Sequence, residues 1–220
     1  MKHVLEFDSL ELWYQTRSIL SSVYMKCEVG EIVGVLGRNG SGKSSLMKIV
    51  FGSLKGSHQS IRIDGKQLPA NHLNRRLIGY LPQESLIPSF ISIRKTFRLF
   101  GISEEEIIVE FPEIKDFLEL KPTQLSGGYQ RIIEAILILK SKGLFCILDE
   151  PFSGLMPVHV EKLKQIITLE KAKKGIIVTD HMYRHVLSIT DRLYLLANGK
   201  TYLVKSEEDL IARGYVNASM

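Results

Sequence analysis

The clearest chemistry in this 220-residue sequence lies at Gly37–Ser44, which reads GRNGSGKS and fits the pattern G-x-x-x-x-G-K-[ST]. Glycines in such a turn let the backbone fold tightly, so that free N–H groups point inward at an anion. Lys43 could then reach the β- and γ-phosphates of a nucleotide, and the Ser44 hydroxyl could bind Mg²⁺. The pattern therefore predicts a phosphate-binding loop, against the alternative of an ordinary glycine-rich turn with a surface lysine.

The segments on either side of this phosphate loop support the prediction. Ile32–Leu36 is an apolar run that indicates a buried strand, and Ser45–Val50 indicates a helix. The N-terminus of that helix adds a favourable partial positive charge for an anion. The residues that we expect to contact a nucleotide here are Gly37, Asn39, Gly40, Ser41, Gly42, Lys43, Ser44 and Ser45.

A pair of carboxylates follows a second apolar run. Leu144–Leu148 predicts a strand covered on both faces, as in a parallel sheet, and Asp149 and Glu150 come directly after it. Beside a phosphate loop, such an aspartate helps to hold Mg²⁺. The adjacent glutamate can polarise a water for attack on the γ-phosphate. The alternative is a simple acidic turn, Asp-Glu-Pro, at a strand end.

A second turn of small residues, Ser126-Gly127-Gly128, precedes the segment Tyr129–Lys140. That segment predicts a helix that is apolar on nearly every side, and therefore deeply buried, with Gly143 as its cap. A serine and two glycines at a helix N-terminus make a second anion-binding surface. The alternative is a serine N-cap followed by a flexible turn.

Together, Leu125–Gly128, the phosphate loop before it and Asp149-Glu150 after it resemble the motifs of ATP-binding-cassette (ABC) ATPases. The resemblance covers nearly the whole chain. It implies an α/β fold: a RecA-like phosphate-loop core with an antiparallel β subdomain and a small helical subdomain. It also implies that two such domains enclose two ATP molecules. Each ATP is held by the phosphate loop of one chain and by the signature turn, Ser126-Gly127-Gly128, of the other.

The resemblance assigns an adenine-stacking role to Tyr14, where the family places an aromatic side chain. Such stacking is worth ~1–3 kcal/mol per base. The adjacent Trp13 is the competing candidate, but strand alternation points it to the opposite face, which favours Tyr14. Alternatively, both side chains only pack the β subdomain.

Two more positions match the family one at a time. Gln83 falls at the glutamine loop, where it would contact Mg²⁺ and the attacking water and couple ATP to the helical segment; otherwise it is a solvated turn residue. His181 resembles the switch histidine that hydrogen-bonds the γ-phosphate, although a lone histidine after a strand is usually structural. His185 receives no role, because a two-histidine metal site there lacks further ligands.

The sequence departs from the family pattern at three places. Tyr129 stands where glutamine commonly follows the signature turn, and Met156 stands where aspartate is common. The segment 84–125 is short for the family, and that surface usually docks the partner. These departures bear on the contact between chains, the hydrolysis rate and the kind of partner.

We expect a single ABC ATPase domain over residues 1–220, with the ATP-binding core and β subdomain at 1–83 and 126–220 and the helical subdomain at 84–125. The remaining expected strands and helices follow from apolar periodicity and turn residues. The strands are 4–7, 10–14, 23–29, 60–64, 78–83, 176–179 and a hairpin at 192–203 that turns at Asn198-Gly199. The helices are 94–100, 104–109, 113–118, 158–171, 181–188 and a capped helix at 206–213.

The composition of the sequence limits the kinds of partner and the cellular compartment that we expect for this protein. The net charge of +5 is spread over both halves, so it indicates no nucleic acid. Cys27 and Cys146 lie in apolar stretches and are expected to be reduced core thiols. The first residues, Met1–Glu6, lack a long apolar signal region, and no run approaches the ~18 to 20 apolar residues of a membrane span. A membrane role would therefore come through a partner.

These motifs predict an ATPase that uses ATP and Mg²⁺ as the nucleotide-binding subunit of an ABC transporter. It would form an ATP-dependent homodimer that drives a separate integral membrane subunit, from a cytoplasmic position at the inner face of the membrane. One alternative is a soluble ABC ATPase that acts as a mechanical switch, although large coiled-coil insertions and tandem cassettes are both lacking. Another is a nucleotide-sensing module that barely hydrolyses ATP, to which only Met156 points.

Overall fold

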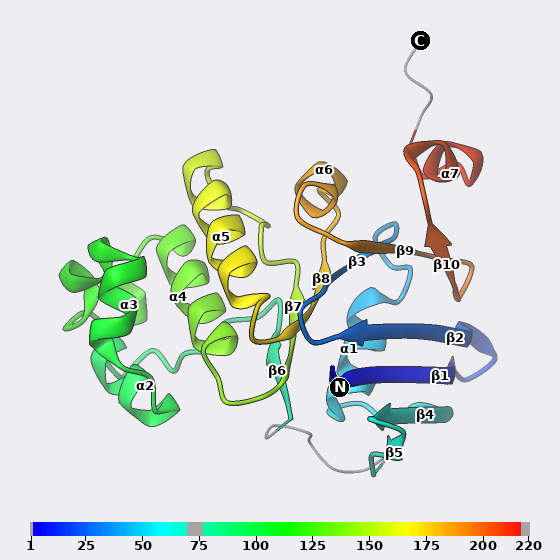
Figure 1. Ribbon diagram of the computed structural model, residues 1–220, viewed down its shortest axis with the longest axis horizontal. Helices are drawn as coiled ribbons and strands as arrows, with labels where there is room; N and C mark the ends of the chain where they lie inside the picture. Colours follow the sequence, from blue (N-terminus) through cyan, green and yellow to red (C-terminus); the bar gives the residue numbers. More distant parts are fainter. Residues whose placement is uncertain (1, 70–76, 217–220) are drawn as a thin grey trace.

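The computed structural model describes residues 2–69 and 77–216, whose strands form two sheets (Figure 1). The smaller sheet is antiparallel, with the order β2-β1-β4-β5. Its strands are β1 Val4–Tyr14, β2 Arg17–Glu28, β4 His58–Ile63 and β5 Lys66–Gln67. The larger sheet has the order β10-β9-β3-β8-β7-β6 and is parallel except for β10. Its strands are β3 Ile32–Leu36, β6 Ile78–Leu81, β7 Phe145–Asp149, β8 Gly175–Thr179, β9 Arg192–Ala197 and β10 Lys200–Val204.

Helices cover both faces of the larger sheet. The α-helices are α1 Lys43–Phe51, α2 Ile93–Phe100, α3 Glu104–Glu110, α4 Gly127–Leu139, α5 Pro157–Glu170, α6 Tyr183–Leu187 and α7 Glu207–Ala212. Two 3₁₀ helices, η1 Pro112–Phe117 and η2 Pro122–Gln124, join α3 to α4. In Figure 1, α4 and α5 lie on one side of the sheet, and α2 and α3 lie outside α4.

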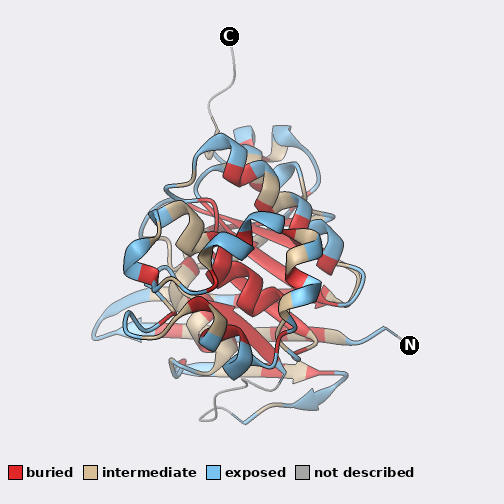
Figure 2. Ribbon diagram, turned by 90° about the vertical axis from the view of Figure 1, so that its left-hand side faces the viewer, coloured by how far each residue is buried: buried red, intermediate tan, exposed pale blue. Residues whose placement is uncertain are grey.

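Two large apolar cores hold these layers together. One core packs α1 between the two sheets, and the other packs α4, α5 and the helical segment around residues 93–118 against the opposite face of the larger sheet. The strands β3, β7 and β8 are buried along their whole length, as expected for parallel strands covered on both faces. Figure 2 shows the buried residues concentrated in the sheets and inner helices, with exposed residues outside. The RecA-like core with an antiparallel β sheet, which the resemblance to ABC ATPases implies, is confirmed.

All of the expected strands are present, but some bounds were predicted wrongly. The strand expected at 23–29 is β2, which already begins at Arg17, and the short strand β5 was not predicted. The two strands expected before Tyr14 are one continuous strand, β1, which carries register shifts between Phe7 and Leu10. Ser9 has φ of +52° at this irregularity, so the polar break in the sequence marks a bulge and not a turn. The hairpin turn at Asn198-Gly199 is confirmed, because both residues have positive φ between β9 and β10.

Three details of the helices were predicted wrongly. Gly143 does not cap α4, which ends at Leu139 with Lys140 as its C-cap; a Cβ on Gly143 would lie 2.9 Å from the Leu77 carbonyl oxygen, so close backbone approach requires glycine there. The segment expected as a helix from His181 is helical only over α6, because Asp180 accepts a bond from the Met182 N–H and turns the chain first. Ser206 makes no side-chain cap on α7.

Both cysteines are free and buried, as expected. Burial raises the pKa of the Cys146 thiol to about 12 and that of Cys27 well above its usual value. Within residues 2–69 and 77–216, no helix combines the length and the apolar composition that crossing a bilayer requires.

Candidate active site

The phosphate loop joins the end of β3 to the start of α1. Gly40 and Gly42 have φ of +77° and +101°, which only glycine adopts without strain. A Cβ on Gly37 would lie 2.8 Å from the Leu196 carbonyl oxygen and 2.6 Å from Ser41 Oγ, so that position also needs glycine. Ser41 Oγ is buried and makes no hydrogen bond within the described residues. The loop is therefore a cradle whose shape comes from its glycines.

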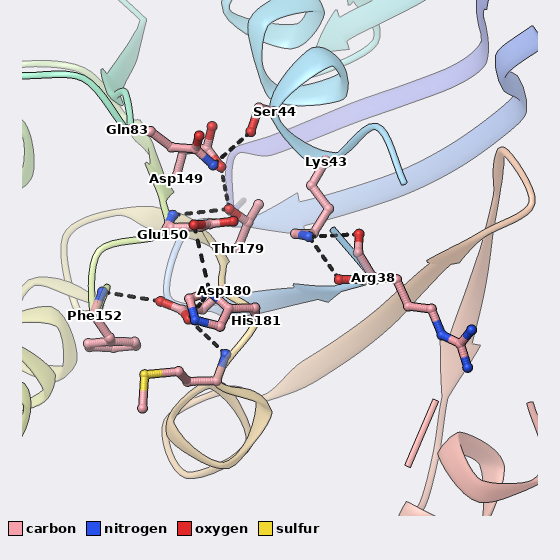
Figure 3. A network of polar contacts seen from close by, with 12 residues as sticks. Arg38, Lys43, Ser44, Gln83, Asp149, Glu150, Phe152, Thr179, Asp180 and His181 are labelled. Atoms are coloured by element: carbon pink, nitrogen blue, oxygen red, sulfur yellow. Dashed lines mark hydrogen bonds and ion pairs between the residues drawn. The ribbon is translucent and has the colours of Figure 1, made fainter. Parts of the chain in front are cut away.

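Lys43 is nearly fully buried at the start of α1, with 5% of its surface exposed. Its ammonium donates to the carbonyl oxygens of Gly37, at 2.8 Å, and Arg38, at 3.3 Å, so it lies across the mouth of its own loop (Figure 3). Burial lowers the pKa of Lys43, while the nearby carboxylates of Glu150 and Asp149 act in the opposite sense. This buried cation makes the loop a site for an anion.

The three predicted Mg²⁺ ligands come from three separate segments. The Gln83 side chain, beyond β6, donates to Ser44 Oγ at 3.1 Å, so the amide and the hydroxyl already meet. Asp149 is fully buried at the end of β7. Its carboxylate accepts from the Thr179 hydroxyl at 2.6 Å and from the Tyr80 hydroxyl at 3.2 Å. Oxygen donors of this kind suit Mg²⁺, so the residues fit the ion that the sequence predicts.

Glu150 follows Asp149 with a φ of +51°, which is uncommon for a residue with a side chain. Its N–H donates to the carbonyl oxygen of Thr179, the last residue of β8, at 2.9 Å, and this bond holds the unusual backbone of Glu150 in place. His181 Nδ1 lies 3.6 Å from Glu150 Oε2, so the predicted base and switch histidine are neighbours (Figure 3). Strained residues that the surroundings hold in place cluster at active sites.

One cleft collects most of the predicted residues from β1, the phosphate loop and the three strand ends. It is lined by Tyr14, Ile19, Asn39, Gly40, Gly42, Lys43, Ser44, Ser45, Gln83, Glu150 and His181. Trp13 does not line this cleft, although Trp13 and Tyr14 are both about half exposed. The cleft therefore favours Tyr14 over Trp13 as the aromatic residue that faces a nucleotide.

The signature turn does not line this cleft. Ser126 caps α4, and its Oγ accepts from the Tyr129 N–H at 3.3 Å, as the N-cap alternative predicts. Gly127 lines a neighbouring cleft together with Gln83 and Glu150. A Cβ on Gly128 would lie 2.8 Å from Nδ1 of the buried His159, so α5 packs directly behind the turn. The N-terminus of α4 is therefore already formed, but it does not line the cleft that contains the phosphate loop.

Several residues that organise the site were missed in the sequence. Asp180 is fully buried and accepts from the N–H groups of Phe152 and Met182, so it joins the segment after Glu150 to His181. On α4, Arg131 donates to the Pro82 carbonyl oxygen and Glu134 accepts from the Leu86 N–H, so both contact the backbone around Gln83. The sequence did contain a signal for Arg131 and Glu134, because charged residues in an otherwise apolar, buried helix need partners.

His185 makes no ligand cluster of the kind that a two-histidine metal site would need. Its ring packs edge-on against Phe152, with 5.8 Å between the centroids. Across the described parts of the chain, no group of three or more His, Cys, Asp or Glu residues is placed to hold a metal ion. His185 thus has a packing contact and no evident chemistry.

Comparison with known proteins agrees with this geometry. A family model described as "ABC transporter" matches residues 20–153, more than half of the chain. The lipopolysaccharide export system ATP-binding protein LptB of Haemophilus influenzae is 33% identical, over 94% of this chain and 92% of that protein. The high-affinity branched-chain amino acid transport ATP-binding protein BraG of Pseudomonas aeruginosa is 28% identical, over 90% of both chains.

A solved structure described as the ATP-binding subunit of an ABC transporter has the same fold. It superposes with a TM-score of 0.82 and 25% sequence identity, covering 98% of this chain and 95% of that one. The phosphate loop, the strand-end carboxylates and the signature turn thus occur together in a chain that matches such proteins over nearly its full length. The chain belongs to the ABC transporter family and is one of its ATP-binding ATPases.

Proposed function

We propose that this chain is the ATP-hydrolysing subunit of a transporter whose membrane-spanning part is a separate protein. We further propose that it works as a head-to-tail homodimer. The observation that carries the dimer is the separation of the two anion-binding turns. Lys43 lines one cleft, whereas the signature turn that starts at Ser126 does not reach it. A second chain, placed head to tail, would bring each turn to the other's nucleotide.

The proposal gives a role to each of the polar side chains at the site. Lys43 binds the β- and γ-phosphates, and Tyr14 stacks on adenine, with the remaining loop residues donating N–H groups. Ser44, Gln83 and Asp149 would hold Mg²⁺, which would neutralise phosphate charge when bound.

The two residues beside the γ-phosphate would carry the hydrolysis step. Glu150 accepts the proton of the attacking water, and His181 hydrogen-bonds the γ-phosphate. Their separation of 3.6 Å suits joint action on one reacting group.

The helical segment 84–125 is proposed as a subdomain that docks the membrane subunit, while 1–83 and 126–220 form the core. Three of the most exposed large apolar side chains of the described residues, Phe90, Leu99 and Val109, belong to this segment. Exposed apolar side chains suit a protein partner. The relatives named for lipopolysaccharide export and branched-chain amino acid transport support a transport role. Docked on such a membrane subunit, the chain would lie at the inner face of the membrane. No observed feature favours the mechanical-switch alternative.

A complementation experiment tests the composite site. In a Glu150→Gln background, which suppresses hydrolysis, closed dimers should accumulate with Mg-ATP. Lys43→Ala homodimers lack a working phosphate loop. Ser126→Arg homodimers lack a working signature turn, because the cation blocks the helix N-terminus. A mixture of the two variants retains one intact site in each heterodimer, formed by a wild-type Lys43 and a wild-type Ser126.

Size-exclusion chromatography with saturating Mg-ATP reads out the result. We expect dimer for the mixture and mainly monomer for each variant alone. If all three samples are monomeric while the Glu150→Gln parent dimerises, one composite site does not suffice to close the dimer. If the parent also stays monomeric, the homodimer proposal is wrong and the chain pairs with a different partner.

A further inference from the structure

Glu134 is a buried carboxylate that the reaction scheme leaves without a role. It lies on α4, which is otherwise apolar where it is buried, and only 2% of the residue is exposed. Its Oε1 accepts from the Ser85 hydroxyl at 2.8 Å, the Leu86 N–H at 2.9 Å and the Gln130 side chain at 3.2 Å. Burying a charged group is costly unless it is paired and hydrogen-bonded, so these contacts stabilise one arrangement of the loop after Gln83.

Arg131 makes the matching contact on the other side of Gln83. One guanidinium nitrogen donates to the Pro82 carbonyl oxygen at 2.6 Å, and another donates to the Asp149 carbonyl oxygen at 2.6 Å. Arg131 and Glu134 are three residues apart on one face of α4, with 3.7 Å between their charged atoms. One turn of α4 therefore holds the chain on both sides of Gln83. Arg131 bonds the residue directly before it, and Glu134 bonds the segment that begins two residues after it.

Gln83 is the residue that the contacts of Arg131 and Glu134 would position. Between them, its side chain extends to Ser44 Oγ at 3.1 Å. A glutamine on an exposed loop loses side-chain and backbone freedom when it is fixed, and this loss of conformational entropy opposes its ordering. Contacts that already order the neighbouring backbone remove that cost from the catalytic step.

We propose that Glu134 and Arg131 are positioning residues that hold Gln83 against Ser44 in the active site. Because α4 begins at the signature turn, the same helical turn would also connect that turn to the glutamine loop of its own chain. In the dimer, the signature turn serves one nucleotide and Gln83 the other, so α4 would link the two sites. This last step rests on the proposed head-to-tail dimer; the positioning of Gln83 does not.

The first test needs neither nucleotide nor dimer. Glu134→Ala removes the carboxylate that accepts all of these hydrogen bonds. Ser85→Ala removes the hydroxyl that donates to Glu134, and it lies on an accessible loop, so it opens no cavity on α4. The N–H groups of Leu86 and Ile87 both donate to Glu134 Oε1, Ile87 at 3.4 Å. Amide hydrogen exchange at these two residues, measured on the nucleotide-free protein, should be faster in both variants than in wild type. Glu161→Gln, an exposed carboxylate on α5, is the control and should leave those amides unchanged. Unchanged exchange in both Ser85→Ala and Glu134→Ala would overturn the proposal.

The second test is a double-mutant cycle in kcat between Glu134→Ala and Gln83→Ala, repeated with Ser85→Ala. If Glu134 acts through Gln83, Glu134→Ala should lower kcat roughly 3- to 30-fold with little change in the Kd for Mg-ATP, and it should add almost nothing to Gln83→Ala. Ser85→Ala should behave in the same way with a smaller loss, and it serves for both tests if Glu134→Ala does not fold.

The outcomes separate the two proposals. Effects that multiply independently, while Gln83→Ala is itself impaired, would overturn the positioning role and leave the proposed ATPase site intact. A Gln83→Ala variant with wild-type kcat would remove the role given to Gln83 in hydrolysis, and the positioning proposal would fall with it.

Discussion

The phosphate loop and the signature turn are both glycine-containing helix N-termini, yet they are built for different surroundings. The phosphate loop wraps around its own cation, with Lys43 nearly fully buried across the loop mouth and positive φ at Gly40 and Gly42. The signature turn is open, and Ser126 only caps its own helix. One turn is an enclosed anion site within a single chain, whereas the other presents a helix N-terminus outward. In the proposed dimer, a nucleotide bound by one chain would therefore leave that chain's signature turn free for the partner.

The largest expected effect is on nucleotide affinity, and it comes from removing the cation of the phosphate loop. Lys43→Ala should abolish binding of Mg-ATP at micromolar nucleotide, because the phosphates lose their nearest fixed cation and a charge-assisted hydrogen bond is worth about 1.5–3 kcal/mol. Isothermal titration calorimetry on the monomer measures this. The matched change on the open turn, Ser126→Arg, should leave the affinity of the monomer unchanged. Weakened binding by the monomeric Ser126→Arg protein would contradict the division between the two turns.

The next effect separates binding from chemistry within the cleft. Glu150→Gln keeps the shape of the side chain but cannot accept the proton of the attacking water, so hydrolysis should fall by ~10²–10⁴-fold. Nucleotide affinity should be retained, because Lys43 and the loop N–H groups are untouched. A phosphate-release assay under saturating Mg-ATP measures the loss. Near-wild-type turnover would require another base, and His181, at 3.6 Å from Glu150, would be the first candidate.

A smaller effect distinguishes the two aromatic residues at the end of β1. Tyr14→Ala should weaken nucleotide binding by the monomer by ~1–3 kcal/mol, the value of one base–aromatic stacking contact. Trp13→Ala is the matched control and should bind as wild type does, since Trp13 does not line the cleft. The affinity for ATP relative to inorganic triphosphate isolates the adenine contribution. Equal losses in both variants would indicate that the pair only stabilises the β sheet.

The sequence predicted the parts of the site whose physics is local. The phosphate loop follows from glycine spacing, and β3 and β7 follow from continuous apolar runs that end where a parallel sheet places its ligands. The loop and the two strands depend on neighbouring residues, so a single sequence carries them. Gln83 and His181 were predicted from the resemblance to ABC ATPases, and both line the cleft.

The features that the sequence did not predict depend on contacts between distant segments. The positive φ of Glu150 is fixed by Thr179, and Glu134 meets Leu86 across 48 residues. Gly143 was predicted as a helix cap because local rules favour glycine there, whereas its real constraint is the backbone beside Leu77. A polar residue in a buried helix indicates that a partner exists, but only the fold shows which residue that partner is.

The smallest predicted effect concerns the helix behind the open turn. Met156 occupies the N-cap of α5 with no side-chain cap, its side chain is largely exposed, and Pro157 begins the helix. Aspartate at an N-cap accepts from the free N–H groups of the first turn, typically worth about 1 kcal/mol. Met156→Asp should therefore raise the free energy of unfolding by about that amount, and the melting temperature by roughly 2–4 °C for a chain of this length.

This change also bears on the difference between the two turns, because α5 carries His159, which packs behind Gly128 of the signature turn. The added cap should stabilise the helix on the signature side and leave the affinity of the monomer for Mg-ATP as in wild type. Met156→Ala, which offers no acceptor, is the control in thermal unfolding followed by circular dichroism. Since an N-cap acts through the first turn of its own helix, a Met156→Asp protein that melts no higher than the alanine variant would mean that the N–H groups of α5 are already satisfied. A change in nucleotide affinity would mean that the open turn and the enclosed turn are coupled within one chain.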